Sequence, residues 1–265
     1  METQMTTQIV LKTVKDNIGI ITLNNPKKCN VINPDLIYLF QEHFHALSED
    51  SNVDVIIING NGKHFCAGAD LNHMNKMASS SESENQRDAL WLSQLFELIY
   101  SASKPTICCA HGHVFGGGLG IMAASDIVIA DPNSSFCFPE VKIGLIPATI
   151  AIFILQRIGY QHAKRLMLTA DIFDSKYAMH IGLADKISSE DEVLNAGLKI
   201  AAQLKNNDKK AIMATKKLLN TLQPIDKDQL TQAADLLAQI RTTDTTRDKI
   251  TAFLNKERAR NNFDI

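Results

Sequence analysis

Short continuous hydrophobic runs dominate the first 190 residues, and hydrophobic residues at helical spacing dominate the rest. Such runs favour β-strands that are covered on both faces. Strands are expected at residues 8–14, 18–23, 54–59, 105–110 and 126–131. Asp16-Asn17 between the first two strands predicts a hairpin. Hydrophobic residues at steps of three and four predict a helix at 35–47, and a strongly apolar segment predicts another at 89–102. This alternation of strands and helices is typical of an α/β core.

The last third of the chain contains no strand-like runs and predicts a helical tail. Helices are expected at residues 190–205, 208–221, 226–240 and 243–257. We therefore expect a core over residues 1–197 and a C-terminal helical region over residues 198–265. Within the core, the polar stretch 75–88 is rich in Ser, Glu and Gln. Its composition predicts the most mobile segment of the protein.

Composition and charge exclude several classes of protein. The chain has 265 residues, 45% of them hydrophobic, which is enough for a sizeable core. Lys and Arg number 27 against 29 Asp and Glu, and a net charge of −2 argues against nucleic-acid binding. We expect neither a secretory signal nor a membrane span, since no apolar stretch reaches about 18 residues. Five cysteines without a C-x-x-C motif favour buried, reduced thiols and a cytoplasmic location.

Two glycine-rich loops carry the candidate chemistry. GNGKHFCAGAD (60–70) and HGHVFGGGLG (111–120) each follow an expected buried strand, and the second leads into a helix. Glycine lets a ligand approach the main chain closely, and unpaired N–H groups at a helix N-terminus favour negative charge. Two converging backbone donors would suit an enolate oxygen. The alternative for either loop is that its glycines serve only tight packing between strand and helix.

A dinucleotide-binding site is the main rival interpretation of the second loop. Gly118 to Ala123 fits the pattern G-x-G-x-x-A, and Asp131 ends the next expected strand. However, Asp131 lies 13 residues beyond Gly118, where that fingerprint requires roughly 20. No Gly-Lys-Ser/Thr follows either, so a Walker-type phosphate loop is also disfavoured.

Three motifs in order resemble the crotonase, or enoyl-CoA hydratase/isomerase, superfamily. They are HFCAGADL (64–71), HGHVFGGGLGIMAASDIVIAD (111–131) and FPEVKIGLIP (138–147). The resemblance extends from NNPKKCNVIN (24–33) to TAFLNKERA (251–259) and so covers nearly the whole chain. It implies an α/β fold, a crotonase-like spiral of ββα units with a C-terminal helical trimerisation region. It also implies a homotrimer or a dimer of trimers.

The resemblance further implies an acyl-CoA thioester substrate whose carbonyl oxygen is held by two backbone N–H groups. The matching positions here are Ala69 and Gly117. Other matching positions are expected to contact the substrate: Lys27, Lys28, Ala67, Asp70, Leu71, Gly116, Phe253 and Lys256. For the last two, a core phenylalanine and a solvated lysine are the alternatives. No metal and no separate cofactor are expected, because coenzyme A is part of the substrate.

Glu140 is the candidate acid/base group. It follows an apolar run, Phe136 to Pro139, which would desolvate a carboxylate and raise its pKa toward neutrality. The resemblance gives this position a catalytic glutamate, whereas a lone Glu after Pro is ordinarily a solvated loop residue. The family's hydratases carry a second glutamate where this chain has Gly120. The family's enoyl-CoA isomerases, by comparison, keep only one glutamate.

These features leave three candidate functions. The segment from Gly118 onward resembles a branch that handles branched, carboxylated acyl-CoAs such as 3-methylglutaconyl-CoA and that likewise lacks the second glutamate. We therefore expect a hydratase for a short, branched 2-enoyl-CoA, with His113 or Lys142 as conceivable partners of a substrate carboxylate. The alternatives are an enoyl-CoA isomerase that uses Glu140 alone and an acyl-CoA-binding protein without catalysis.

Overall fold

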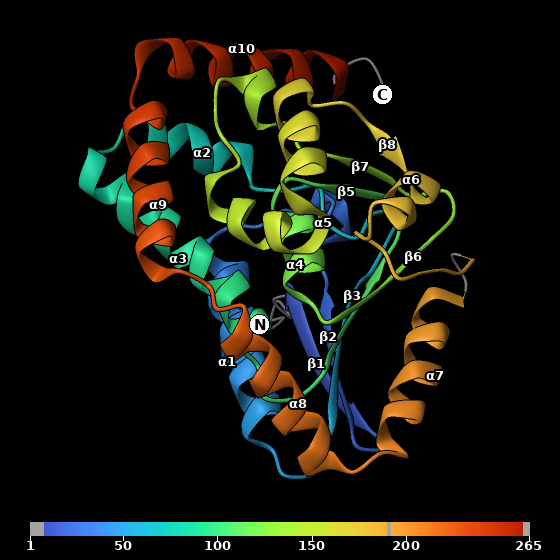
Figure 1. Cartoon of the computed structure of the whole chain (residues 1–265). Helices are drawn as coiled ribbons and strands as arrows, with labels where there is room; N and C mark the ends of the chain where they lie inside the picture. The colour runs from blue at the N-terminus through green and yellow to red at the C-terminus, as the bar shows by residue number, and fades with distance from the viewer. Residues whose placement is uncertain (1–7, 190–191, 262–265) are drawn as a thin grey trace, which may run out of the picture.

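A six-stranded sheet forms the centre of the computed structural model, which describes residues 8–189 and 192–261, with side chains as far as Asn255 (Figure 1). In spatial order its strands are β1 (Val10–Lys15), β2 (Ile18–Leu23), β3 (Val55–Gly60), β4 (Thr106–Ala110), β6 (Ile127–Ala130) and β9 (Lys186–Ile187). β1 and β2 form the predicted antiparallel hairpin, and every other neighbouring pair is parallel. The α/β core with buried parallel strands is therefore confirmed.

Alternate residues of the central strands face two different hydrophobic clusters, because successive side chains of a strand point to opposite faces. In β3, Ile56 and Ile58 join the larger cluster, whereas Val55 and Ile57 join the smaller one. α1 (Pro34–Glu49), α3 (Glu82–Tyr100), α4 (Gly117–Ala124) and α5 (Ala148–Thr169) supply residues to the larger cluster. α7 (Val193–Lys205) covers the other face. Burial on both faces explains why these strands have continuous apolar sequences.

A second, three-stranded sheet was not predicted. It consists of β5 (His113–Phe115), β7 (Ser135–Cys137) and β8 (Phe173–Asp174). The segment HGHVFGGGLG is therefore not one loop, since its middle residues form β5 parallel to β7. α5 and the short α6 (Ser175–His180) were not predicted either. Strands of two or three residues are too short to leave a readable pattern in the sequence.

The polar stretch 75–88 is largely helical, and the expectation that it is the most mobile segment stays a prediction. It contains the end of α2 (Leu71–Ala78) and the start of α3. Ser81 caps α3 in a capping box with Glu84, a polar signature that resembles a loop when composition alone is considered. α1 and the remainder of α3 lie where the hydrophobic spacing predicted them.

The helical tail is confirmed, with α7 followed by α8 (Lys209–Leu222), α9 (Lys227–Arg241) and α10 (Asp244–Asn261). α9 packs against α3, and α10 crosses the end of α9 and packs against α2 (Figure 1). The expected domain division after residue 197 stays a prediction, and that residue lies inside α7. None of the helices in the described part of the chain is long and apolar enough to cross a membrane. All five cysteines are free, and four of them are buried.

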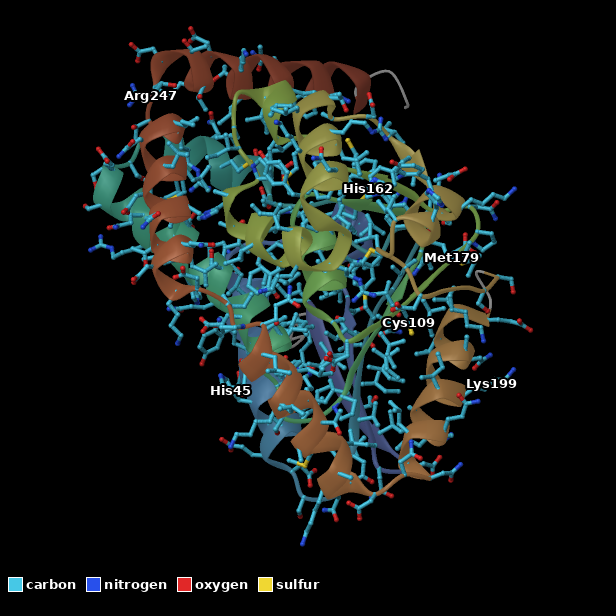
Figure 2. The ribbon with its side chains drawn as sticks, in the orientation of Figure 1. His45, Cys109, His162, Met179, Lys199 and Arg247 are labelled. Atoms are coloured by element: carbon cyan, nitrogen blue, oxygen red, sulfur yellow. The ribbon has the colours of Figure 1, made fainter. Side chains whose placement is uncertain are left out.

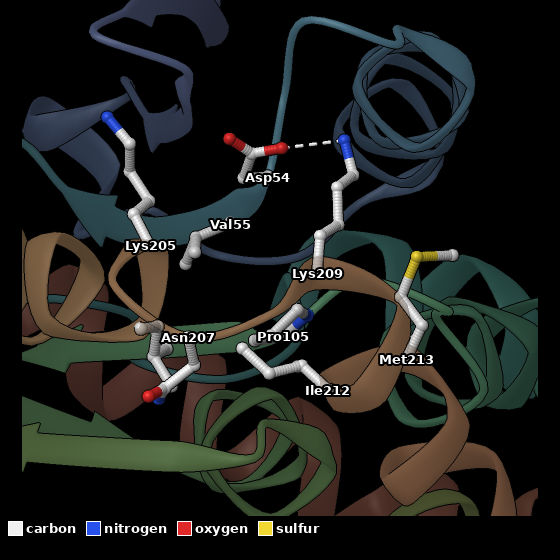
Figure 3. A pocket seen from close by; sticks show the side chains of 9 residues that line it. Asp54, Val55, Pro105, Lys205, Asn207, Lys209, Ile212 and Met213 are labelled. Carbon is white, nitrogen blue, oxygen red and sulfur yellow. Dashed lines mark ion pairs between the residues drawn. The ribbon is translucent and has the colours of Figure 1, made fainter.

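A small cavity of about 40 Å³ lies at the amino-terminal edge of the sheet, between β3 and the connection from α7 to α8 (Figure 3). Lys209 Nζ lies 2.6 Å from Asp54 Oδ1 there and anchors the start of α8. The candidate loops follow the carboxyl ends of β3 and β4, so this cavity belongs to the edge that carries no candidate chemistry.

The contact between α7 and the sheet provides a test of the fold. A Cβ at Gly197 would lie 2.5 Å from Sγ of Cys109, which is on the sheet face toward α7 (Figure 2). Gly197→Ala should therefore lower the free energy of unfolding by about 1–3 kcal/mol, although alanine ordinarily stabilises a helix. Cys109→Ala in the same chain should recover part of that loss, as measured by urea unfolding. Equal losses with and without Cys109→Ala would contradict this packing.

Candidate active site

The first corner of the site is the segment 65–70, which runs between the early loop and β5. Cys66 pairs in parallel with Val114, and Ile32 on the other side pairs with Ala69. This pairing and the close approach of Gly68 to Gly116 bring the segment that contains Ala69 beside the segment that contains Gly117. The positive φ of Gly68, 98°, lets the segment turn there. A Cβ on Gly68 would lie 3.9 Å from the Cα of Gly116, so the two glycine corners touch.

The second corner is the entry into α4. The Gly116 N–H donates to the Cys137 carbonyl at 3.1 Å, and its φ of 48° turns the chain from β5 into the helix. Gly117 is the first helical residue, and α4 is buried along its whole length. A Cβ on Gly118 would lie 2.6 Å from the Cys66 carbonyl oxygen, so this glycine serves close packing between the corners. The packing interpretation therefore holds for Gly118, and the ligand-binding interpretation of the loops stays a prediction.

The N–H groups of Ala69 and Gly117 point away from their own elements. The N–H and C=O bonds of a trans peptide point in opposite directions. The Gly68 carbonyl accepts from Ile32, so the Ala69 N–H points away from Ile32. The Gly116 carbonyl accepts from Leu119 inside the helix, so the Gly117 N–H points out of the helix N-terminus. Within the described residues, neither N–H has a protein acceptor, which leaves both available to a ligand oxygen.

Glu140 places a carboxyl group beside these corners. It begins the 3-10 helix η2 (Glu140–Ile143), and its Oε1 lies 3.0 Å from where a Cβ on Gly116 would be. Its Oε2 is buried and has no hydrogen-bond partner among the described residues. Burial raises the pKa of Glu140 to about 7, against a smaller opposing effect of a hydrogen bond from its own backbone. A group with that pKa is suited to both accept and donate a proton near neutral pH.

The position of the missing second glutamate is filled by hydrophobic side chains. A Cβ on Gly120 would lie 2.5 Å from Cγ2 of Ile150 and 2.7 Å from Cε1 of Phe96. Both side chains are fully or almost fully buried. We name this pair the apolar wall. A longer side chain at position 120 would therefore require these neighbours to move.

The expected substrate-contacting residues lie in three places. Ala67, Asp70, Leu71 and Gly116 belong to the two corners, where Asp70 caps α2 by accepting from the Asn72 and His73 N–H groups. Lys27 and Lys28 are exposed on the 3-10 helix η1 (Pro26–Lys28). Phe253 on α10 is 37% exposed and so is not a core phenylalanine. The Lys256 side chain lies outside the described residues. The structure thus brings the first four together.

Asn30 is a supporting residue that the sequence analysis missed. Its side chain is fully buried, donates to the carbonyls of Asn61 and His64, and accepts from the Asn25 N–H. It therefore fastens the early loop to the first glycine loop. A polar residue in a polar loop gives no sign of burial, and the apolar wall was missed because its residues lie far apart in the sequence.

The cations considered for a substrate carboxylate have protein partners. Lys142 Nζ donates to the Ala170 carbonyl at 2.6 Å. The His113 ring stacks on His64 with centroids 4.2 Å apart, and its Nδ1 lies 2.6 Å from the Ser135 hydroxyl. Among the described residues, no group of three or more His, Cys, Asp or Glu side chains could hold a metal ion.

The raised pKa of Glu140 makes stability depend on pH. Between about 4.5 and about 7 the folded carboxyl remains protonated while the unfolded one ionises, so stability falls as the pH rises through this window. Relative to the parent, Glu140→Gln should therefore raise the free energy of unfolding more at pH 8 than at pH 5. The difference should be up to about 3 kcal/mol, as measured by urea unfolding. The exposed Glu42→Gln is the control. An equal effect of Glu140→Gln at both pH values would contradict the buried, neutral carboxyl.

Comparisons with known proteins agree with this geometry. The chain is 30% identical over 248 residues to a crotonyl-CoA hydratase of Syntrophomonas wolfei, with 92% of this chain and 94% of that protein covered. It is 29% identical over 233 residues to a peroxisomal Δ(3,5)-Δ(2,4)-dienoyl-CoA isomerase of Arabidopsis thaliana, with 83% of each covered. The crystal structure of an enoyl-CoA hydratase from Shewanella pealeana superposes with a TM-score of 0.79, at 31% identity and 95% coverage of both chains.

The sequence profile described as enoyl-CoA hydratase/isomerase matches residues 13–263, which is nearly the whole chain. The motifs that carried the resemblance are those that form the two corners and the Glu140 turn. The chain belongs to the enoyl-CoA hydratase/isomerase family, with the crotonase fold.

Proposed function

We propose that the protein adds water to a short 2-enoyl-CoA thioester. The observation that carries this proposal is the buried carboxyl of Glu140, whose Oε2 has no partner among the described residues, beside two corners in which the Ala69 and Gly117 N–H groups likewise find no acceptor there. Ala69 and Gly117 would hold the thioester oxygen, and Glu140 would move the proton. Preorganised donors of this kind stabilise an oxyanion by about 2.7–4 kcal/mol each, judged by removal of one such donor in another enzyme.

The proposed reaction uses one carboxyl group twice. Ionised Glu140 takes a proton from water as the water oxygen bonds to C3 of the enoyl group. The electron pair of the C2–C3 double bond moves to the thioester, whose oxygen becomes an enolate held by the two N–H groups. Protonated Glu140 then returns its proton to C2, which restores the thioester. A pKa of about 7 leaves both forms of Glu140 populated near neutral pH.

The narrower proposal is a branched acyl group such as that of 3-methylglutaconyl-CoA. It is supported by the resemblance of the segment from Gly118 onward to hydratases that lack the second glutamate. The relative from Syntrophomonas wolfei is named for the short crotonyl group, which supports a short chain. The apolar wall gives the acyl group hydrophobic neighbours rather than a second carboxylate.

An enoyl-CoA isomerase is the second candidate, and the apolar wall favours it. Moving the double bond of a 3-enoyl thioester requires one group that takes a proton from C2, which gives a dienolate, and returns the proton to C4, and Glu140 alone can do both. With Phe96 and Ile150 beside Gly120, no carboxylate there can hold a water molecule. The Arabidopsis relative is named as an isomerase, which shows that the family includes such chemistry.

We further propose a homotrimer, or a dimer of trimers, in the cytoplasm. Leu218, Leu219 and Leu222 on α8 are each more than half exposed, as expected of residues that a second copy would cover. The buried free cysteines fit a reducing compartment.

The Gly117 N–H can be removed without removing a side chain. Gly117→Pro deletes the donor, and proline is tolerated at the first position of a helix. We expect kcat to fall about 10²- to 10³-fold. Gly117→Ala is the matched control, since it meets the same Ile32 contact at 2.7 Å but keeps the N–H. Equal losses in the two variants would show that crowding, and not the donor, matters.

A substrate panel separates the candidate functions. We expect 3-methylglutaconyl-CoA and crotonyl-CoA to gain water, as measured by loss of enoyl absorbance and by mass. Glu140→Gln should lower kcat at least 100-fold. Double-bond migration of a 3-enoyl-CoA without water uptake would support the isomerase. Binding of acyl-CoA without turnover, with the same affinity in Glu140→Gln, would support the non-catalytic binding protein.

A further inference from the structure

Consecutive residues of α10 contact the ends of the two short elements on which the site is built. Thr246 donates its hydroxyl hydrogen to the Gly144 carbonyl at 2.9 Å. Arg247, at the start of α10, donates from Nε to the Ala78 carbonyl at 2.8 Å (Figure 2). Gly144 ends the η2 turn that begins at Glu140, and Ala78 ends α2, which begins two residues after Ala69.

The contact of Thr246 with the η2 turn is close and buried. Thr246 is 2% exposed, and a Cβ on Gly144 would lie 3.5 Å from the Cα of Thr246. Gly144 has a φ of 75°, and the next N–H, that of Leu145, donates back to the Glu140 carbonyl at 2.9 Å. The peptide that Thr246 holds is therefore one hydrogen bond away from the backbone of Glu140.

α2 is held to the helical tail by a second, part-buried contact. His73 Nε2 lies 2.6 Å from Asp88 Oδ1 on α3, and Arg241 Nη1 on α9 lies 2.7 Å from the other oxygen. Burial opposes ionisation of Asp88, but the His73 hydrogen bond and the Arg241 charge outweigh it, so the pKa of Asp88 is lowered. α2 has eight residues and is held both along its side and at its end. Its position therefore determines that of Ala69, which lies two residues before it.

One hydrophobic cluster packs these elements together. It contains Ala78 of α2, Ile143 and Leu145 of the Glu140 turn, Leu237 of α9 and Ile250 of α10. Hydrophobic packing is not directional, so it leaves the relative register of the two short elements to hydrogen bonds. Thr246 and Arg247 supply bonds to both.

We propose that Thr246 and Arg247 are positioning residues that set the distance between the Glu140 carboxyl and the Ala69 N–H. Thr246 acts on the proton-transfer side and Arg247 on the oxyanion side. The inference rests on the proposed function only in that both groups serve one thioester, and it holds for hydration and for isomerisation alike.

The test uses a reaction common to both candidates, exchange of the C2 hydrogen of butyryl-CoA in D2O. Glu140 removes the C2 proton, the enolate is held by the two N–H groups, and Glu140 returns a deuteron after exchange with solvent. Thr246→Val should slow this exchange about tenfold and shift the pH midpoint of its rate. Thr246→Ser, which keeps the hydroxyl, should stay within about twofold of the parent. Arg247→Met should slow it about three- to tenfold without moving the midpoint.

The controls are Thr231→Val and Arg165→Met, which remove a hydroxyl bond within α9 and an exposed ion pair on α5. Both should match the parent. A Thr246→Val rate equal to the parent, or an equal loss in Thr246→Ser, would overturn the proposal.

Backbone amide hydrogen exchange, measured by mass spectrometry, tests the positioning role of Thr246 and Arg247 without requiring turnover. Arg247→Met should speed exchange at least threefold in peptides spanning residues 65–78, and Thr246→Val should do so at residues 140–145. Unchanged protection in both segments would overturn the positioning role. A parent that exchanges no C2 hydrogen would instead defeat the proposed function, with the amide measurement still testing these two residues.

Discussion

The parallel pairing of Cys66 with Val114 is the constraint on which the site depends. Two segments that are almost 50 residues apart in sequence meet there, and their register sets which main-chain groups face a common point. With Cys66 opposite Val114, the segment that contains Ala69 lies beside the segment that contains Gly117. A slip of one residue would turn every peptide group to the other side. The glycines at 68, 116 and 118 permit this approach, because a Cβ at any of them would contact the opposite segment or Glu140.

The carboxyl of Glu140 completes the site at a cost to stability. Its Oε2 has no protein partner in the described part of the chain, and a buried carboxylate without partners is unfavourable. The fold keeps this group in place through the η2 turn, whose end is held by Thr246. A site of this kind is stabilised by its surroundings rather than by its own contacts, as is common where a group must change charge during a reaction.

The sequence predicted the parts of this protein that repeat a pattern over many residues. The buried strands and the four C-terminal helices have such patterns, and so their positions were predicted to within a few residues. The loop motifs identified Ala69, Gly117 and Glu140, and the structure places their segments together. β5, β7 and β8 were not predicted, because each has only two or three residues. The end of α2 and the capped start of α3 were not predicted as helices, because capping residues and loop residues are of the same types. Asn30, Phe96 and Thr246 act through contacts across the fold, which no local pattern contains.

The division of labour in the site explains why one carboxyl group can suffice. In the proposed mechanism, charge on the thioester oxygen is met by main-chain donors, which do not depend on side-chain identity, so substitution at neighbouring positions leaves them intact. Proton movement is assigned to Glu140 alone. Because Phe96 and Ile150 fill the space beside Gly120, the part of the proposed site that can vary is the set of side chains around the acyl chain. In the proposed mechanism, whether Glu140 takes a proton from water or from C2 of the substrate then depends on the acyl group and its fit beside this apolar wall, and not on any further catalytic side chain.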